Sequence, residues 1–398
     1  MSDRARTPRF PFRASVAAAI TTLAIVVAAC GSPIAANPSV ARPSPLPRPM
    51  PSSGPPDPRP IVFPADDGPH RRLTEWWYYT GHLQDEQTGD RYGFEFVVFR
   101  AERGTFPVSW ASHLALTDET AGRFLYAQRT AIGGAVDSSP AGALGLAVPS
   151  AAAGAGGGAW TMSGRDGIGR LRATANATET STGTSFTLDL QVNPRKPAVL
   201  HDTDGWIDFG PGGGSYYYSR TAIDAVGSVV VDGQTAKVTG TAWFDHQWGD
   251  FIAVGGGGWD WFAVNLDDGT DLTLSLVRDT DGSYPLVYGT LVDTHGVATH
   301  LPRDAFSVTV TEHWRSPTTN ADYPAGWRVE LPGEGLVINL VPTVPDQELD
   351  TRPTTGVVYW EGSQRVVATR DGKPLGGQAY VELTGYGPAG VGGASPAP

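Results

Sequence analysis

The sequence predicts an all-β protein built from antiparallel strands. Short apolar and aromatic runs with a period of two recur along the chain, and this is the pattern of strands with one buried face. The 398 residues include 50 glycines and 33 prolines, which interrupt helices and favour turns. We find no amphipathic run of helical period longer than two turns. The length allows two domains of ordinary size, each with an apolar core.

The first 29 residues have the pattern of a secretion signal. Four arginines precede an apolar run, Ala14 to Ala29, that is short for a membrane span. The run leads to Cys30, the one cysteine of the chain, in Val-Ala-Ala-Cys-Gly. This ending resembles the lipobox of bacterial lipoproteins, whose cysteine carries the lipid. We expect an extracytoplasmic protein anchored to the bacterial cell membrane through lipidated Cys30; an ordinary signal peptide or an uncleaved anchor is the alternative.

Residues 30–60 are rich in Pro, Ser and Ala, a composition that favours an extended tether. The folded body is therefore expected to begin near Ile61. At the other end, residues 388–398 contain mainly Gly, Ala and Pro and predict a disordered tail.

Strand candidates follow one another between these ends, separated by turn residues. They are residues 72–83, 92–99, 112–117, 186–192, 216–221, 227–233, 272–276, 306–310, 327–331, 337–341, 356–362 and 379–386. A turn is expected at Asp232-Gly233. Residues 133–158 consist mostly of small residues, so we predict a mobile insertion or flap there and no core element. So many antiparallel strands need protected edges, and closure into barrels would leave an interior able to hold one small apolar ligand.

One stretch concentrates most of the reactive and aromatic side chains. It runs from Thr241 to Asp250 with the sequence TAWFDHQWGD, and Trp259-Asp260-Trp261 follows after a glycine run. Its position well inside the chain allows it to join two halves of the protein.

Several segments together resemble the AttH-type and carotenoid 1,2-hydratase family of lipocalin-like proteins. They are Glu75–Leu83, Gly93–Phe96, Tyr217–Thr221, Val238–Gly249, Gly258–Phe262, Tyr359–Gly362 and Tyr380–Tyr386, in the order of the family. The resemblance implies two tandem lipocalin-like antiparallel β-barrels, residues 61–253 and 254–387, with a pocket for an apolar ligand. It also implies chemistry without a cofactor, such as the hydration of a carbon–carbon double bond.

Hydrating an alkene requires an acid, a base and aromatic faces that stabilise a carbocation. The candidate catalytic residues are Asp245, His246 and Trp248, of which His246 and Trp248 match the His-x-Trp of the hydratases. The candidate ligand-binding residues are Glu75, Trp76, Trp77, Tyr78, His82, Trp243, Trp259, Asp260 and Trp261.

The Tyr-x-Asp pair of the hydratases has no counterpart at Leu274–Asp279. Its absence favours a carrier of a lipid or isoprenoid over a lyase or isomerase. The Trp-rich stretch also fits a purely structural role, in which a buried polar network holds two barrels together.

Other classes of function lack their sequence signals. A formal charge of −12 argues against a nucleic-acid partner. We find no Gly-x-Ser-x-Gly elbow, Walker loop or dinucleotide fingerprint. His82, His113 and His246 share no metal-ligand spacing. We therefore expect a monomer without metal or cofactor.

Overall fold

The computed structural model describes residues 57–150, 158–251 and 257–388. The predicted signal segment, Cys30, residues 30–56 of the tether and all but Pro388 of the predicted tail lie outside these ranges. All the described residues belong to one compact unit. Among the described residues, no helix has the length and apolar content to cross a membrane.

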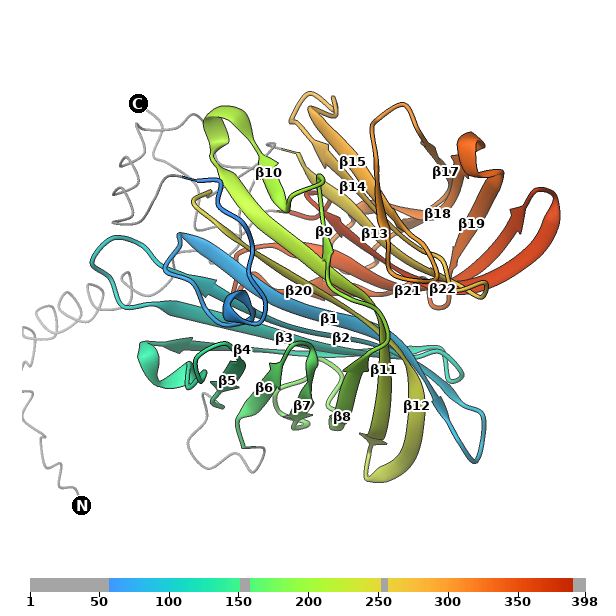
Figure 1. Ribbon diagram of the computed structural model, residues 1–398. Coiled ribbons are helices and arrows are strands. Elements are labelled where there is room, and N and C mark those ends of the chain that lie inside the picture. Colours follow the sequence, from blue (N-terminus) through green and yellow to red (C-terminus); the bar gives the residue numbers. More distant parts are fainter. Residues whose placement is uncertain (1–56, 151–157, 252–256, 389–398) are drawn as a thin grey trace, which may run out of the picture. The chain divides into compact units, whose positions relative to one another are not determined.

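The first of two antiparallel sheets has 12 strands and follows the chain from Thr74 to Gly249 (Figure 1). Its main order is β4 (Arg123–Ile132), β3 (Ser109–Asp118), β2 (Arg91–Ala101), β1 (Thr74–Asp85), β12 (Gln234–Gly249), β11 (Gly214–Val231), β8 (Phe186–Pro194), β7 (Ile168–Ala175), β6 (Trp160–Arg165) and β5 (Leu144–Val148), while β9 (Val199–Leu200) and β10 (Trp206–Asp208) pair with β11. The sheet curls so that its end strands β4 and β5 come into contact.

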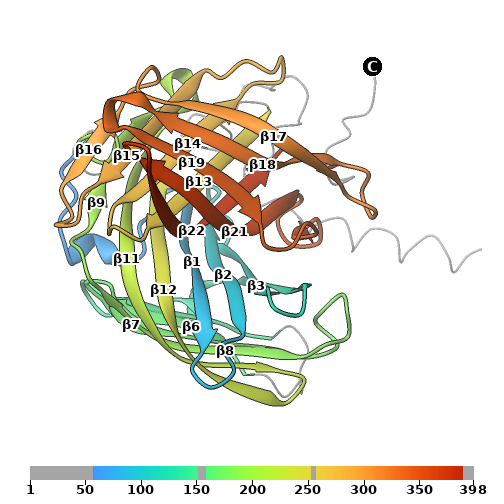
Figure 2. The same ribbon diagram turned by 90° about the vertical axis from the view of Figure 1, so that its right-hand side faces the viewer.

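The second sheet has 10 strands and follows the chain from Gly258 to Thr384 (Figure 2). Its main order is β16 (Ala298–Leu301), β15 (Leu286–Val292), β14 (Asp271–Arg278), β13 (Gly258–Leu266), β22 (Lys373–Thr384), β21 (Val358–Arg370), β19 (Leu336–Pro342), β18 (Asp322–Leu331) and β17 (Ser307–Arg315), while β20 (Glu348–Asp350) pairs with β21. The helical content of the described ranges is four short 3₁₀ turns, η1 (Ala65–Asp67), η2 (Gly134–Val136), η3 (Gly210–Gly212) and η4 (Pro332–Glu334). The predicted all-β fold with two barrel-like antiparallel sheets is thus confirmed.

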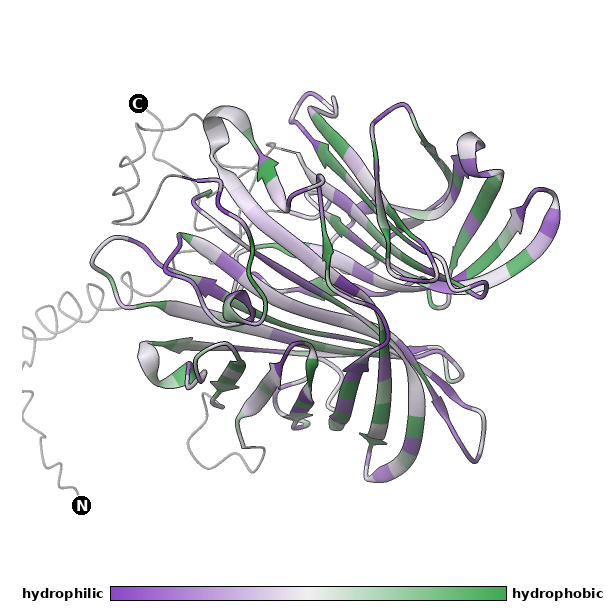
Figure 3. Ribbon diagram, viewed as in Figure 1, coloured by the Kyte–Doolittle hydropathy of each residue, from purple (hydrophilic) through white to green (hydrophobic). Residues whose placement is uncertain are grey.

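Each sheet curls around its own apolar core. Hydrophobic and polar residues alternate along strands such as β8 (Figure 3). The core of the first sheet includes Trp77 and Trp248, and that of the second includes Trp327 and Trp360. A third, smaller cluster that includes Trp243 and Trp261 joins side chains of both sheets. The opposite faces of some strands are therefore also buried, because the two sheets pack against each other there.

The predicted turn at Asp232-Gly233 connects β11 and β12. Both residues have positive φ, 48° and 77°, as a two-residue turn of type I′ requires. This turn fixes the register of the longest pairing of the first sheet, in which Val231 lies opposite Gln234.

The prediction for residues 133–158 is wrong where the structure describes them. Leu144, Leu146 and Val148 alternate along β5 and are buried in the core of the first sheet. The small residues around them hid this short period-two run, because the composition of a window averages over strand and loop. Residues 151–157 lie outside the described ranges.

We predict that Leu146→Ala lowers the free energy of unfolding by about 2 to 5 kcal/mol, since it removes a fully buried side chain from a packed core. Chemical denaturation of the purified protein measures this change. The control is Ile168→Ala, because Ile168 is 62% exposed. Equal small effects of both substitutions would show that β5 does not contribute to the core.

Candidate functional site

Strand β12 divides the three predicted catalytic residues between two faces. Side chains alternate along a strand, so Trp243, Asp245 and Gln247 point one way and His246 and Trp248 the other. Asp245 and Gln247 line a pocket between the two sheets. Trp248 belongs to the core of the first sheet, and the ring of His246 lies against it, tilted by 37° with 4.5 Å between ring centroids.

The neighbouring strand β1 divides the predicted ligand-binding residues in the same way. Tyr78 pairs with Asp245 in register, and Trp77 pairs with His246. Trp76 and Tyr78 line the pocket, whereas Glu75 and Trp77 point into the first sheet. Trp259 and Trp261 of β13 face the pocket from the second sheet.

Aromatic side chains form most of the pocket wall. They are Trp76, Tyr78, Phe99, Phe209, Tyr217, Phe251, Trp259, Trp261, Tyr288 and Tyr359. The polar groups on the wall include the carboxyl groups of Glu95, Asp245 and Glu382. An apolar cavity with a few convergent polar groups is the usual form of a small-molecule site.

Asp245 is held by three donors. Tyr217 Oη donates to Oδ2 at 2.6 Å, Trp243 Nε1 donates to Oδ1 at 2.7 Å, and Ser219 Oγ donates to Oδ1 as well. Burial raises the pKa of Asp245 to about 6, although these donors oppose the shift. Asp245 is therefore mainly ionised at pH 7, and its orientation is fixed. Trp261 Nε1 donates to Tyr217 Oη at 3.0 Å and so ties the second sheet to this group.

Among the three carboxyl groups on the pocket wall, Glu95 on β2 has the pKa that is raised furthest. Burial raises its pKa to about 8, and the charge of Glu382 adds to the shift. Tyr359 Oη lies 2.8 Å from Glu95 Oε1, while Oε2 has no hydrogen-bond partner among the described residues. Glu95 is therefore mainly protonated at pH 7 and has one oxygen unused by the protein.

Two more buried glutamates lie next to Glu95. Burial raises the pKa of Glu382 on β22 to about 7. Burial and the charges of Glu95 and Glu382 raise the pKa of Glu361 on β21 well above its usual range. Tyr78 Oη donates to Glu361 Oε1 at 2.6 Å. Such clustered carboxyl groups retain protons because several negative charges cannot share a site of low polarity.

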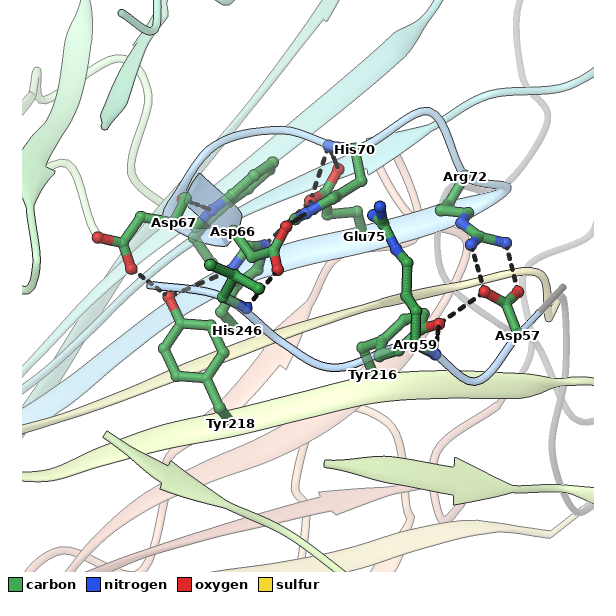
Figure 4. Close-up of polar contacts among 12 residues, drawn as sticks. Asp57, Arg59, Asp66, Asp67, His70, Arg72, Glu75, Tyr216, Tyr218 and His246 are labelled. Atoms are coloured by element: carbon green, nitrogen blue, oxygen red, sulfur yellow. Dashed lines mark hydrogen bonds and ion pairs between the residues drawn. The ribbon is translucent and has the colours of Figure 1, made fainter. Parts of the chain in front are cut away.

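The opposite face of β1 and β12 carries a separate polar network (Figure 4). Glu75 Oε1 lies 2.9 Å from His246 Nε2 and 2.7 Å from His70 Nδ1, and Asp66 Oδ1 lies 3.2 Å from His70 Nε2. Burial raises the pKa of Glu75, but both histidines lower it further, so the net shift is downward. Burial by itself lowers the pKa of His70, but the charges and hydrogen bonds of Glu75 and Asp66 outweigh this effect, so the net shift is upward. Burial lowers that of His246.

The ring atoms of His70 and His246 and a carboxylate oxygen of Glu75 have the spacing of metal ligands, within 4.8 Å of one another. They satisfy each other by hydrogen bonds, and Arg100 lies 4.0 Å from Glu75. This arrangement suits a charged structural network at least as well as a metal ion. His82 and His113 have other partners, Glu119 and Tyr359.

The remaining predicted residues do not line the pocket. His82 links the sheets, because its Nε2 lies 3.0 Å from the carbonyl oxygen of Ala379. Trp243 supports Asp245. Asp260 points away from the pocket and is held by Arg278 and Tyr386.

The sequence interpretation missed Glu95, Glu361, Glu382, Tyr217 and Tyr359 as site residues. All five lie in the segments that carried the family resemblance. The signal available was a single glutamate between large apolar neighbours in a strand, as in Phe94-Glu95-Phe96. Such a glutamate faces away from its own sheet's core, and only the packing of a second sheet buries it.

The sequence model of the AttH-like family matches residues 55–386. The chain belongs to this family. A solved structure assigned as AttH, from Nitrosomonas europaea, is 33% identical, with a TM-score of 0.68 over 82% of this chain and 98% of that one. Kievitone hydratase from Nectria haematococca is 18% identical, with a TM-score of 0.60 over 82% and 93%, and shares the fold. No curated protein matches the chain.

The protonated state of Glu95 in this AttH-like protein predicts a pH dependence of stability. The usual pKa of a glutamate is 4.5, and the folded protein keeps this proton up to about pH 8. Between these values the folded state binds the proton that the unfolded chain has lost, so stability falls as the pH rises. Glu95→Gln removes this contribution. Relative to wild type, the variant should gain about 2 kcal/mol between pH 6 and pH 7.5, at about 1.4 kcal/mol per pH unit.

Denaturation curves of both proteins at several pH values measure this difference. Glu86→Gln, the same change at an exposed position, is the control for the substitution itself. Parallel pH profiles of wild type and Glu95→Gln would contradict a protonated Glu95.

Proposed function

We propose that the protein binds an apolar ligand, such as an isoprenoid or lipid chain, in the pocket between the sheets and adds or moves a proton on it without a cofactor. The reaction class is that of a hydro-lyase or isomerase. The observation that carries the proposal is the pairing of a protonated acid, Glu95, with an ionised carboxylate, Asp245, in one aromatic pocket. Carboxyl groups whose pKa values differ through their surroundings are the usual signature of acid and base roles.

In this mechanism Glu95 donates its proton to a double bond or carbonyl of the ligand. The faces of Trp76 and Trp259, which line the pocket, stabilise the positive charge that develops. Asp245 then accepts a proton, either from the water that adds to the cation or from the neighbouring carbon. The first route is hydration and the second is isomerisation.

The size of the cavity limits what can enter it. Its volume is about 110 Å³, somewhat smaller than an apolar cavity of about 150 Å³ that accepts benzene. The pocket therefore suits one narrow end of an apolar molecule, such as a prenyl group.

A carrier without catalysis is the second candidate. The aromatic wall supports it, and so does the missing Tyr-x-Asp of the hydratases. It gives no reason for three carboxyl groups at the wall of a pocket for apolar ligands, since buried carboxyl groups reduce the affinity for such ligands. This cost favours the enzyme.

Incubation with acyclic isoprenoids in ¹⁸O-labelled water, followed by mass spectrometry, tests the enzyme proposal. We expect labelled or isomerised product from wild type. Glu95→Gln and Asp245→Asn should each lower turnover by roughly 100-fold or more, while ligand quenching of tryptophan fluorescence persists.

The matched control is His246→Gln, which changes the other face of β12 and should keep turnover in the folded protein. Binding without turnover by wild type would leave the carrier. Loss of turnover in His246→Gln alone would place the chemistry inside the first sheet.

We further propose that lipidated Cys30 anchors the protein outside the cytoplasm. Cys30→Ser should abolish incorporation of labelled palmitate and move the protein from the membrane fraction to the soluble fraction of expressing bacteria. Retention of the variant in the membrane fraction would contradict an anchor of this kind.

A further inference from the structure

A chain of hydrogen bonds connects Glu95 with the edge of the buried region. Tyr359 Oη lies 2.8 Å from Glu95 Oε1, and His113 Nδ1 lies 2.8 Å from the same hydroxyl. His113 Nε2 lies 3.1 Å from Thr354 Oγ1, which lies 2.6 Å from Gln128 Oε1. Glu95, His113 and Tyr359 are buried, whereas Thr354 and Gln128 are partly exposed. The chain therefore reaches from the pocket wall to residues that are partly exposed.

His113 is suited to pass a proton through this chain. Burial lowers its pKa to about 3, so the ring is neutral and has one donor and one acceptor nitrogen. Phe99 lies beside it at 5.3 Å between ring centroids. Both ring nitrogens already face a hydroxyl group, as a proton relay requires.

The ionisation state of Glu95 sets the direction of every donor in the chain. When Glu95 is protonated, its O–H donates to Tyr359, Tyr359 donates to His113 Nδ1, and His113 Nε2–H donates to Thr354. When Glu95 is ionised, Tyr359 donates to Glu95 and His113 Nδ1–H donates to Tyr359. The hydroxyl of Thr354 then turns from Gln128 Oε1 and donates to His113 Nε2. The two states thus differ in the tautomer of His113.

We propose that Thr354, His113 and Tyr359 form a proton relay that returns a proton from solvent to Glu95 after each turnover. The proposal rests on the acid role of Glu95 given above. His113 accepts a proton at Nε2 and releases one from Nδ1, and each hydroxyl oxygen accepts a proton as it releases its own, so one proton passes from water at Thr354 to the Glu95 carboxylate. Asp245 releases the proton it has received to water that enters as the product leaves. No electrons are transferred.

Nitrogen NMR of the His113 ring tests the relay without a substrate. In wild type, the Nε2–H tautomer should give way to the Nδ1–H tautomer as the pH passes about 8, the value to which burial raises the pKa of Glu95. Glu95→Gln should keep the Nε2–H tautomer throughout, because the amide donates as the protonated acid does. In Tyr359→Phe, the tautomer of His113 should no longer change with pH, because the hydroxyl that links it to Glu95 is absent.

Other titratable groups also face Glu95, and Glu95→Gln separates their effect from its own. They are Tyr78 on β1, Tyr359 and Glu361 on β21, and Glu382 on β22. The relay would be overturned if the His113 tautomer of wild type did not change with pH, or if it changed equally in Glu95→Gln.

The second test measures deuterium exchange of the Glu95 carboxyl proton in a variant that changes only Thr354, the outer end of the relay. The carboxyl band of Glu95 is identified by infrared spectroscopy as the band that Glu95→Gln lacks. Its shift is then followed after the protein is transferred to D₂O. Thr354→Val should slow this exchange by roughly tenfold or more. Thr130→Val, at an exposed position of β4, should not. Equal exchange in both variants would overturn the relay, whereas the acid role of Glu95 is decided separately by turnover.

Discussion

The two-residue period of β1 and β12 is the constraint on which the rest of the structure depends. It sends Asp245 and Tyr78 to the face where the sheets meet, and His246 and Trp77 to the core of the first sheet. Residues adjacent in the sequence therefore serve two separate sites. One is a closed network around Glu75, and the other is an aromatic pocket that includes ionisable groups.

The contact between the sheets also determines the chemistry of the pocket. Glu95, Glu361 and Glu382 would be ordinary surface groups if either sheet stood alone, because they point away from the cores of their own sheets. When the sheets pack together, these carboxyl groups leave water together, and burial then favours their protonated forms. The packing of the two sheets thus makes Glu95 a protonated acid at neutral pH. The interiors of the two barrels do not contribute to this effect.

The sequence predicts the fold well because strands and turns depend on residues that are close together in the sequence. Period-two runs locate most of the strands, and Asp232-Gly233 predicts its turn from backbone sterics alone. The site is harder to predict, because Glu95, Asp245 and Glu382 lie on three strands that are far apart in sequence. The strand period does separate Asp245 from His246, but only packing shows which face holds a pocket. β5 was missed because its three apolar residues lie among small ones.

The chain belongs to the AttH-like family and shares its fold with kievitone hydratase. The central claim is that ligands bind between the sheets, beside Glu95 and Asp245. A crystal structure with a bound acyclic isoprenoid tests it most directly. We predict ligand density against Trp76 and Trp259, within hydrogen-bond distance of Glu95. Density inside the first sheet, beside His246 and Trp77, would contradict the account.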